Sequence, residues 1–242
     1  MNLVIDIGNT RVKAALFKDN HLFELKIYDS VSALLSDYNF IRQAKNAIIG
    51  SVVDELELFY SALSSILPTL VFNSQTKIPL INLYHSANTL GSDRLAASVG
   101  AYSLYPNSTI LVIDAGTCIK YNFINSKNEY LGGAISPGIE MKFKALEHFT
   151  SKLPLIEFDK SYNELIGTNT QNSILSGVLK GSIGEIDGLI SDYTSNFPDL
   201  ICILTGGDSE FLAKRLKNSI FTHQNLVLKG LNDILNYNLE KK

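Results

Sequence analysis

The sequence predicts an α/β protein that consists of two related lobes. Short apolar runs typical of strands alternate with longer segments whose apolar residues recur at helical spacing. In addition, residues 3–8 match residues 111–116 at five of six positions, and the match continues into the following strand after one deletion at Asn9. An internal repeat of this kind predicts an N-terminal lobe over residues 1–107 and a C-terminal lobe over residues 108–242.

The elements of the N-terminal lobe follow from alternating apolar residues, turn residues and helix caps. Gly8-Asn9 and residues 18–20 have the composition of turns, Ser30 is a good N-cap, and Pro68 and Pro106 each end a helix. These signals predict strands over 3–5, 12–16, 22–28, 47–53 and 70–72, and helices over 31–35, 55–67 and 91–102. Residues 73–90 show no clear period and predict a long surface loop.

The same signals predict the strands and helices of the C-terminal lobe. Strands are expected over 110–114, 119–124, 130–131 and 200–204, and helices over 138–149, 170–193, 209–217 and 230–238. Residues 151–168 are irregular, and Gly206-Gly207 is typical of a turn between a strand and a helix.

Composition and charge exclude several classes of protein. The 242 residues are 45% hydrophobic and 19% charged, with a net charge of −3 and no basic run, so a nucleic-acid partner is not expected. No uncharged stretch approaches the roughly 18 apolar residues of a membrane span, and Asp6 interrupts the N-terminal apolar run, which argues against a signal peptide. Cys118 and Cys202 lie far apart in sequence and match neither a disulfide framework nor a metal-binding motif. We therefore expect a cytoplasmic protein. Cys118 is expected to be a buried, unreactive thiol.

The repeated motif is an Asp-x-Gly turn between two strands, at Asp6 and again at Asp114. The strand carries the carboxylate to its end, and glycine leaves the turn's backbone N–H groups uncovered, which suits a phosphate. The carboxylate can hold a cation beside the phosphate oxygens. One copy alone favours a plain hairpin turn, but two copies in related lobes favour a nucleoside triphosphate held from both sides. Because the sequence has no Walker A motif, ATP would have to bind through these hairpins.

Six motifs carry a resemblance to a known family. In order they are DIGNT at 6–10, YHSANTLGSDR at 84–94, DAGT at 114–117, GGAISPG at 132–138, GTNTQNSILSG at 167–177 and TGGD at 205–208. The hairpins resemble those of the actin, heat-shock ATPase and sugar-kinase superfamily, and the full set resembles type III pantothenate kinases over nearly the whole chain. The resemblance implies two ribonuclease-H-like lobes with the active site in the cleft between them. It also implies ATP-dependent phosphorylation of pantothenate to 4′-phosphopantothenate, with Mg²⁺, a monovalent cation (K⁺ or NH₄⁺) and a homodimer.

The resemblance also assigns roles to individual residues. Asp93 is implied as the catalytic base, Asp114 as the ligand of the monovalent cation, and Asp6 as a second metal-binding residue. Pantothenate is implied to bind at Tyr84, Gly91, Ser92, Asp93, Arg94 and Thr170. The nucleotide is implied to bind at Asp6, Ile7, Gly8, Asn9, Thr10, Arg11, Val12, Lys13, Thr117, Gly206 and Gly207.

Several of these residues also have a purely structural interpretation. An acidic residue such as Asp93 favours the first turn of a helix through the helix dipole. Tyr84 has the character of a partly buried aromatic residue in a loop, Thr170 that of an N-cap, and Gly206 that of a simple turn residue. The N-cap and binding roles of Thr170 are compatible, because free N–H groups lie at a helix start.

Two features remain open from sequence. The family often has Thr and Asp where this chain has Lys120 and Asn122, and the missing carboxylate at 122 would weaken cation binding in the second lobe. The glycines at 177, 181, 184 and 188 form one face of the long helix, which packs closely either within the chain or against a second subunit. The alternatives to a pantothenate kinase are a regulatory protein that resembles Bvg accessory factor and a sugar kinase of the superfamily.

Overall fold

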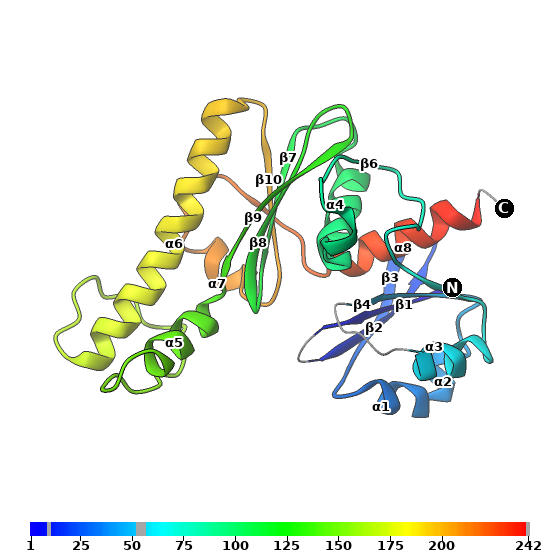
Figure 1. Cartoon of the computed structure of the whole chain (residues 1–242), viewed down its shortest axis with the longest axis horizontal. Helices are drawn as coiled ribbons and strands as arrows, with labels where there is room; N and C mark the ends of the chain where they lie inside the picture. The colour runs from blue at the N-terminus through cyan, green and yellow to red at the C-terminus, as the bar shows by residue number, and fades with distance from the viewer. Residues whose placement is uncertain (9–10, 52–56, 241–242) are drawn as a thin grey trace. The chain divides into compact units, whose positions relative to one another are not determined.

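The computed structural model describes residues 1–8, 11–51 and 57–240 (Figure 1). Its residues form two mixed sheets, and packing divides the chain into two compact units. The first unit contains Met1–Asn107, Ile124–Leu131 and Asn225–Lys242, and the second contains Ser108–Phe123 and Gly132–Gln224.

The first sheet has the strand order β3-β2-β1-β4-β5. Its strands are β1 (Asn2–Ile7), β2 (Val12–Lys18), β3 (His21–Tyr28), β4 (Asn46–Ser51) and β5 (Thr69–Val71). β1, β2 and β3 form an antiparallel meander, whereas β4 runs parallel to β1 and β5 parallel to β4. Leu3, Val4 and Ile5 are fully buried, as expected for a central strand that is covered on both faces.

The described residues of the first unit include five α-helices: α1 (Val31–Ser36), α2 (Tyr38–Ile41), α3 (Glu57–Ser64), α4 (Ser92–Leu104) and α8 (Leu226–Leu239). The Ser30 hydroxyl accepts a hydrogen bond from the backbone N–H of Ala33 at 3.2 Å, which confirms the predicted N-cap. Leu34, Phe40 and Leu63 pack from these helices into the core beneath β1 and β2.

Helices α4 and α8 pack against each other through backbone contacts at two glycines. A Cβ on Gly100 would lie 2.6 Å from the carbonyl oxygen of Leu226, and a Cβ on Gly230 would overlap the carbonyl oxygen of Ala96. Only glycine fits at either position. This contact explains why residues 225–242 pack with the first unit, although they follow the second unit in sequence.

The second sheet has the order β11-β10-β7-β8-β9-β6. Its strands are β6 (Ile81–Asn82), β7 (Ile110–Ala115), β8 (Cys118–Ile124), β9 (Glu129–Pro137), β10 (Ile201–Thr205) and β11 (Phe221–Thr222). Apart from β6, the order repeats that of the first sheet, with β7 in the place of β1, and β10 runs parallel to both β7 and β11. The common order is the structural counterpart of the sequence repeat. β6 pairs with the end of β9 that packs in the first unit.

Three helices belong to the second unit: α5 (Ile139–His148), α6 (Thr170–Asn196) and α7 (Ser209–Ala213). Glu185 on α6 ties α5 and α6 to the sheet, because its carboxylate accepts hydrogen bonds from Tyr121, Ser136 and Lys142. Burial raises the pKa of the Glu185 carboxyl, but the donors from Lys142 and Ser136 outweigh it, and the pKa lies below its ordinary value. The carboxylate is therefore the form that holds β8, β9, α5 and α6 together.

Most of the predicted elements are present, and the differences lie mainly in lengths. The predicted helix over 209–217 ends at Ala213, because the Asp187 carboxylate binds the backbone N–H groups of Lys217 and Asn218 and holds them outside the helix. The last helix begins at Leu226, earlier than the predicted 230. The predicted long loop over 73–90 contains the short strand β6 and a 3₁₀ turn, Ala87–Thr89. α2 and β11 were not predicted, since four- and two-residue elements carry too little periodicity.

Parts of other predictions lie outside the described residues: the Asn9 position of the first turn, residues 52–53 of a predicted strand and residues 55–56 of a predicted helix. The division into lobes at residues 107 and 108 stays a prediction about the repeat. By packing, residues 124–131 and 225–242 join the first unit instead.

The α4–α8 contact predicts the result of one substitution. Gly230→Ala raises intrinsic helix propensity by roughly 0.5–1 kcal/mol, but the new methyl group overlaps the Ala96 carbonyl oxygen. We expect a net loss of about 1–3 kcal/mol in the free energy of unfolding, measured by chemical denaturation. A variant as stable as the parent or more stable would contradict the close approach of the two backbones.

Candidate functional site

The first Asp-x-Gly hairpin lies in the first unit. Asp6 is partly buried near the end of β1, where its Cα pairs with that of Lys13 on β2. The backbone N–H of Gly8 donates to the carbonyl oxygen of Arg11 at 3.1 Å and narrows the turn. Asn9 and Thr10, both predicted to bind the nucleotide, lie outside the described residues.

The remaining predicted residues of this hairpin differ in exposure. Arg11 is exposed and Lys13 is partly buried. The side chains of Ile7 and Val12 belong to the hydrophobic core. Ile7 and Val12 can therefore contribute only backbone groups to a ligand.

The second hairpin, β7–β8, repeats the arrangement in the second unit. Asp114 lies near the end of β7, and the backbone N–H of Gly116 donates to the carbonyl oxygen of Cys118 at 3.1 Å. Thr117 is exposed at the turn. The Asp114 carboxylate forms an ion pair with Lys120 on β8, with 2.7 Å between Nζ and Oδ2, and the two side chains are only 13% and 19% exposed.

Two further segments of the second unit close against this turn. A Cβ on Gly138 would overlap the carbonyl oxygen of Gly116, and a Cβ on Gly206 would overlap that of Ala115. Gly206 has φ of +96°, a conformation that favours glycine. Gly207 has open space around it. Of the predicted pair, Gly206 must therefore be glycine for close packing, whereas Gly207 leaves the adjacent backbone uncovered by a side chain.

Sequence reasoning missed Asp208 as a site residue. Its backbone N–H donates to the carbonyl oxygen of Ala115 at 3.1 Å, which places it beside the β7–β8 turn. Burial raises the pKa of the Asp208 carboxyl, nearby Lys160 lowers it, and Glu140 raises it. The TGGD motif at 205–208 contained the signal, but only its glycines were assigned a role.

The predicted substrate residues of the first unit meet at the start of α4. The Arg94 guanidinium lies 5.6 Å from the centroid of the Tyr84 ring, within the range of a cation–π contact, and Arg94 is only 5% exposed. Tyr84 in turn packs on buried Tyr130, with 6.2 Å between ring centroids. The structure thus places an arginine and an aromatic ring side by side, as the sequence motif predicted.

Asp93 is held beside them by the start of the helix. Its Oδ1 accepts a hydrogen bond from the backbone N–H of Arg94 at 2.8 Å. A Cβ on Gly91 would lie 2.6 Å from the same Oδ1, so Gly91 leaves room for the carboxylate. The Ser92 hydroxyl donates to the carbonyl oxygen of Ser51 at 2.7 Å and fixes the helix start to β4. Ser92 therefore serves as an anchor in this structure.

Thr170 lies in the second unit. It is not the N-cap of α6, because the Asn169 side chain caps that helix by accepting from the backbone N–H of Asn172 at 2.9 Å. The N-cap interpretation of Thr170 is wrong by one residue. Thr170 is exposed and lines a groove of about 800 Å³ between α5 and α6, together with Lys142, Phe149 and Ser173.

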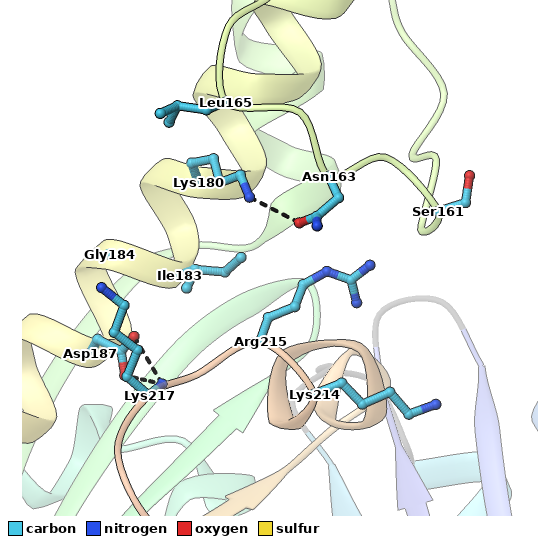
Figure 2. Close-up of a pocket in the computed structure, with 10 residues that line it drawn as sticks. All are labelled: Ser161, Asn163, Leu165, Lys180, Ile183, Gly184, Asp187, Lys214, Arg215 and Lys217. Atoms are coloured by element: carbon cyan, nitrogen blue, oxygen red, sulfur yellow. Dashed lines mark hydrogen bonds between the residues drawn. The ribbon is translucent and has the colours of Figure 1, made fainter.

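A second groove of the second unit contains none of the predicted site residues. It has a volume of about 960 Å³ and lies beside α6 (Figure 2). Lys180, Lys214, Arg215 and Lys217 line it with a single carboxylate, Asp187. Lys180 donates to the Asn163 side chain at 2.9 Å, and the backbone N–H of Lys217 donates to Asp187 (Figure 2).

The two predicted metal-binding carboxylates differ in how well they suit a cation. Mg²⁺ in phosphoryl-transfer enzymes is held by one or two carboxylates together with the substrate phosphates, and Asp6 at the first turn fits that requirement. Asp114 does not suit a free monovalent cation, because the Lys120 ammonium already neutralises its carboxylate at 2.7 Å. Within 1–8, 11–51 and 57–240, no three His, Cys, Asp or Glu side chains form a cluster that could hold a metal by themselves.

Comparison with known proteins gives a consistent result over the whole chain. A family model described as type III pantothenate kinase matches residues 2–192. Proteins described as type III pantothenate kinase from Bacteroides fragilis (strain YCH46) and Christiangramia forsetii are each 43% identical over 244 residues. The alignments cover 98% of this chain and 98% and 99% of those proteins. Among the helices that the structure describes, none has the length and hydrophobicity that a membrane span requires.

Solved structures show the fold. A Campylobacter jejuni protein described as a Baf family transcriptional activator superposes with a TM-score of 0.68 at 23% identity and covers 98% of this chain and 99% of its own. ROK hexokinase from Thermus thermophilus superposes with a TM-score of 0.50 at 11% identity and covers 99% of both chains. Component A of (R)-2-hydroxyglutaryl-CoA dehydratase from Acidaminococcus fermentans superposes with a TM-score of 0.54 at 14% identity and covers 100% of this chain and 99% of its own. The predicted α/β fold with two related sheets is confirmed.

Proposed function

Since the chain belongs to the type III pantothenate kinase family, we propose that it phosphorylates pantothenate to 4′-phosphopantothenate with ATP, the first step of coenzyme A biosynthesis. One observation carries this proposal: relatives described as this enzyme are 43% identical to the chain over nearly its full length. The site residues described above give the reaction a physical basis.

Arg94 and Tyr84 bind the carboxylate end of pantothenate. A guanidinium presents parallel N–H donors that match a carboxylate, and a largely buried site strengthens that interaction. Arg94 is buried and lies against the Tyr84 ring, which limits its side chain to few orientations. The backbone at Gly91 and Ser92 completes the proposed substrate-binding set of the first unit, and Thr170 is the one residue proposed for pantothenate in the second unit.

Asp93 acts as the general base. Phosphoryl transfer requires the acceptor hydroxyl in line with the γ-phosphorus of ATP and a group that takes the hydroxyl proton. As the new O–P bond forms, the bond from the γ-phosphorus to the β–γ bridging oxygen breaks, ADP leaves, and the proton moves to the Asp93 carboxylate. The hydrogen bond from the Arg94 backbone N–H orients that carboxylate.

The two Asp-x-Gly hairpins bind the triphosphate. The N–H groups of Gly8 and Gly116 donate within their own turns, so the proposed phosphate donors are the other backbone N–H groups of the two turns. The hydroxyls of Thr10 and Thr117 are proposed to join them, Thr10 on the sequence motif alone. Asp6 is the proposed protein ligand of Mg²⁺, which neutralises charge on the phosphates when it is bound. Gly206 and Gly207 allow the backbone to approach the adenosine end.

Specific observations argue against both alternative functions, the regulatory protein and the sugar kinase. The transcriptional activator description belongs to a Campylobacter protein that is 23% identical, and at that distance the likeness concerns the fold alone. The same holds for the hexokinase from Thermus thermophilus at 11% identity. The contact of Arg94 with Tyr84 at Asp93 favours a small carboxylate substrate over both DNA and a neutral sugar.

We also propose that the protein is a homodimer in the cytoplasm. Gly177, Gly181, Gly184 and Gly188 are exposed, and a Cβ added at any of them would meet nothing within 4 Å in the described structure. Each glycine costs a helix roughly 0.5–1 kcal/mol relative to alanine, and packing within the chain does not offset this cost. Close contact with the α6 helix of a second subunit would offset this cost.

The location in the cytoplasm is supported by the cysteines, because both are free thiols, as in a reducing compartment.

The activity is tested by a coupled assay of ADP release with pantothenate and a panel of hexoses as acceptors. We expect turnover with pantothenate and only background hydrolysis with the sugars. A hexose used as well as pantothenate would move the chain to the sugar-kinase alternative, and no turnover with any acceptor would favour a regulatory role.

The role of Asp93 is tested by Asp93→Asn, which keeps the size of the side chain but removes its ability to take a proton. We expect kcat to fall by about 10²–10⁴-fold, with ATP affinity nearly unchanged. If Asp93 only stabilises the helix start, the variant would instead lose under about 1 kcal/mol of stability and keep nearly normal turnover. Measuring kcat and the melting temperature on the same sample separates the two roles.

The dimer is tested by Gly181→Leu, which puts a bulky group on the glycine face. We expect sedimentation to show a shift from dimer to monomer. Thr194→Leu is the matched control, since it adds a similar apolar group to an exposed position of the same helix away from that face. A wild-type protein that sediments as a fully active monomer would refute the dimer.

A further inference from the structure

The ion pair between Asp114 and Lys120 has a consequence for how the kinase binds ATP. We propose that the Lys120 ammonium is a built-in monovalent cation, which holds Asp114 and the 115–118 turn in the form that receives the triphosphate, so that the enzyme needs no added K⁺ or NH₄⁺. The inference rests on the proposed function, because it concerns the nucleotide half of that site.

The charge balance at Asp114 supports this role. The Asp114 carboxylate and the Lys120 ammonium lie 2.7 Å apart and are mostly removed from solvent, at 13% and 19% exposure. Together they carry no net charge. A second cation on the same carboxylate would face the ammonium at close range, and position 122 supplies no carboxylate to offset it, because it carries a neutral, buried Asn. Like charges at that distance repel strongly in a poorly solvated site.

The chemistry of the group also fits. A lysine side chain ends in an alkylammonium ion, which carries the same single charge and the same N–H donors as NH₄⁺. Since it is attached to β8, its local concentration does not depend on the salt in the buffer. A carboxylate that must bind a free ion, by contrast, is occupied only when that ion is abundant.

The position of the pair connects it to the turn. Asp114 precedes Ala115, whose carbonyl oxygen receives the Asp208 N–H and contacts Gly206. Lys120 lies two residues after Cys118, whose carbonyl oxygen closes the turn. The ion pair therefore joins the two strands immediately behind the backbone N–H groups that are proposed to bind phosphate.

The repeat shows that a lysine at this place is part of the hairpin's own pattern. Lys13 occupies the matching position in the first hairpin, where its Cα pairs with that of Asp6. Lys120 is thus one copy of a lysine that both halves of the chain carry, rather than an isolated surface substitution.

The test compares the wild type with Lys120→Thr and with Lys120→Met, an uncharged side chain of similar length. Lys229→Thr is the matched control, because it removes a similarly buried ion pair, Lys229 with Asp233 at 2.8 Å, far from either hairpin in sequence. Each protein is assayed in Na⁺ buffer and in K⁺ or NH₄⁺ buffer. The readouts are kcat/KM for ATP and the rise in melting temperature on adding Mg·ATP.

We expect the wild type and Lys229→Thr to give the same values in both buffers. Lys120→Thr should lose at least about tenfold in kcat/KM and most of its ATP-induced stabilisation in Na⁺, and K⁺ or NH₄⁺ should restore both. Lys120→Met should show the same loss, with weaker rescue because its side chain still fills the space.

Two results would overturn the proposal. One is a wild type that K⁺ or NH₄⁺ stimulates about tenfold or more. The other is a folded Lys120→Thr that no cation rescues, which would mean that Lys120 binds the nucleotide directly. If the wild type is stabilised by Mg·ATP but phosphorylates no pantothenate, the proposed function fails, and the melting data still decide the cation question.

Discussion

The close packing around the turn between β7 and β8 is the constraint on which the proposed nucleotide site depends. Three chain segments meet there, and at two of them, Gly138 and Gly206, a Cβ would overlap the turn's own carbonyl oxygens. Such close packing fixes the backbone of residues 115–118 before any ligand binds, and preorganised N–H groups bind phosphate without a further ordering cost. The Asp114–Lys120 pair completes the arrangement on the strand side of the turn. Substitutions that loosen this packing should therefore weaken ATP binding even where they touch no phosphate.

One supersecondary plan serves both halves of the chain. Each sheet is built around a central strand that ends in Asp-x-Gly, with the same order of neighbouring strands on either side. The proposed substrate residues are a local addition to this plan, placed by the start of α4: Gly91 leaves space, Ser92 anchors the helix to β4, and Asp93 and Arg94 follow. The residues proposed to bind the acceptor therefore lie outside the repeated hairpins.

Most strands and helices, and the grouping of Tyr84 with Arg94, could be predicted from the sequence. The features that could not be predicted have physical causes. Alternation and turn residues predicted the central strands, since buried strands in a repeat carry strong patterns, and the motif at 84–94 placed Tyr84 and Arg94 in one site. The Thr170 cap was misassigned because Asn169 caps equally well and only φ and the hydrogen bond decide. The early end of α7 depends on Asp187, which is distant in sequence. Asp208 was missed because its place beside the turn depends on β10 lying next to β7. The Lys120 ion pair was missed although its hairpin was predicted, because the pattern of residues does not show which way the two side chains point. The roles of the site residues remain predictions.

The most direct test is a crystal structure with Mg²⁺, a non-hydrolysable ATP analogue and Rb⁺ as the monovalent salt, recorded at a wavelength where Rb⁺ scatters anomalously. We expect phosphate oxygens on the backbone N–H groups of the 115–118 turn other than that of Gly116, which donates to Cys118. We also expect the Lys120 ammonium still within hydrogen-bond distance of Asp114 and no Rb⁺ peak on that carboxylate. A triphosphate bound away from this turn, or Rb⁺ on Asp114 with Lys120 displaced, would contradict this account.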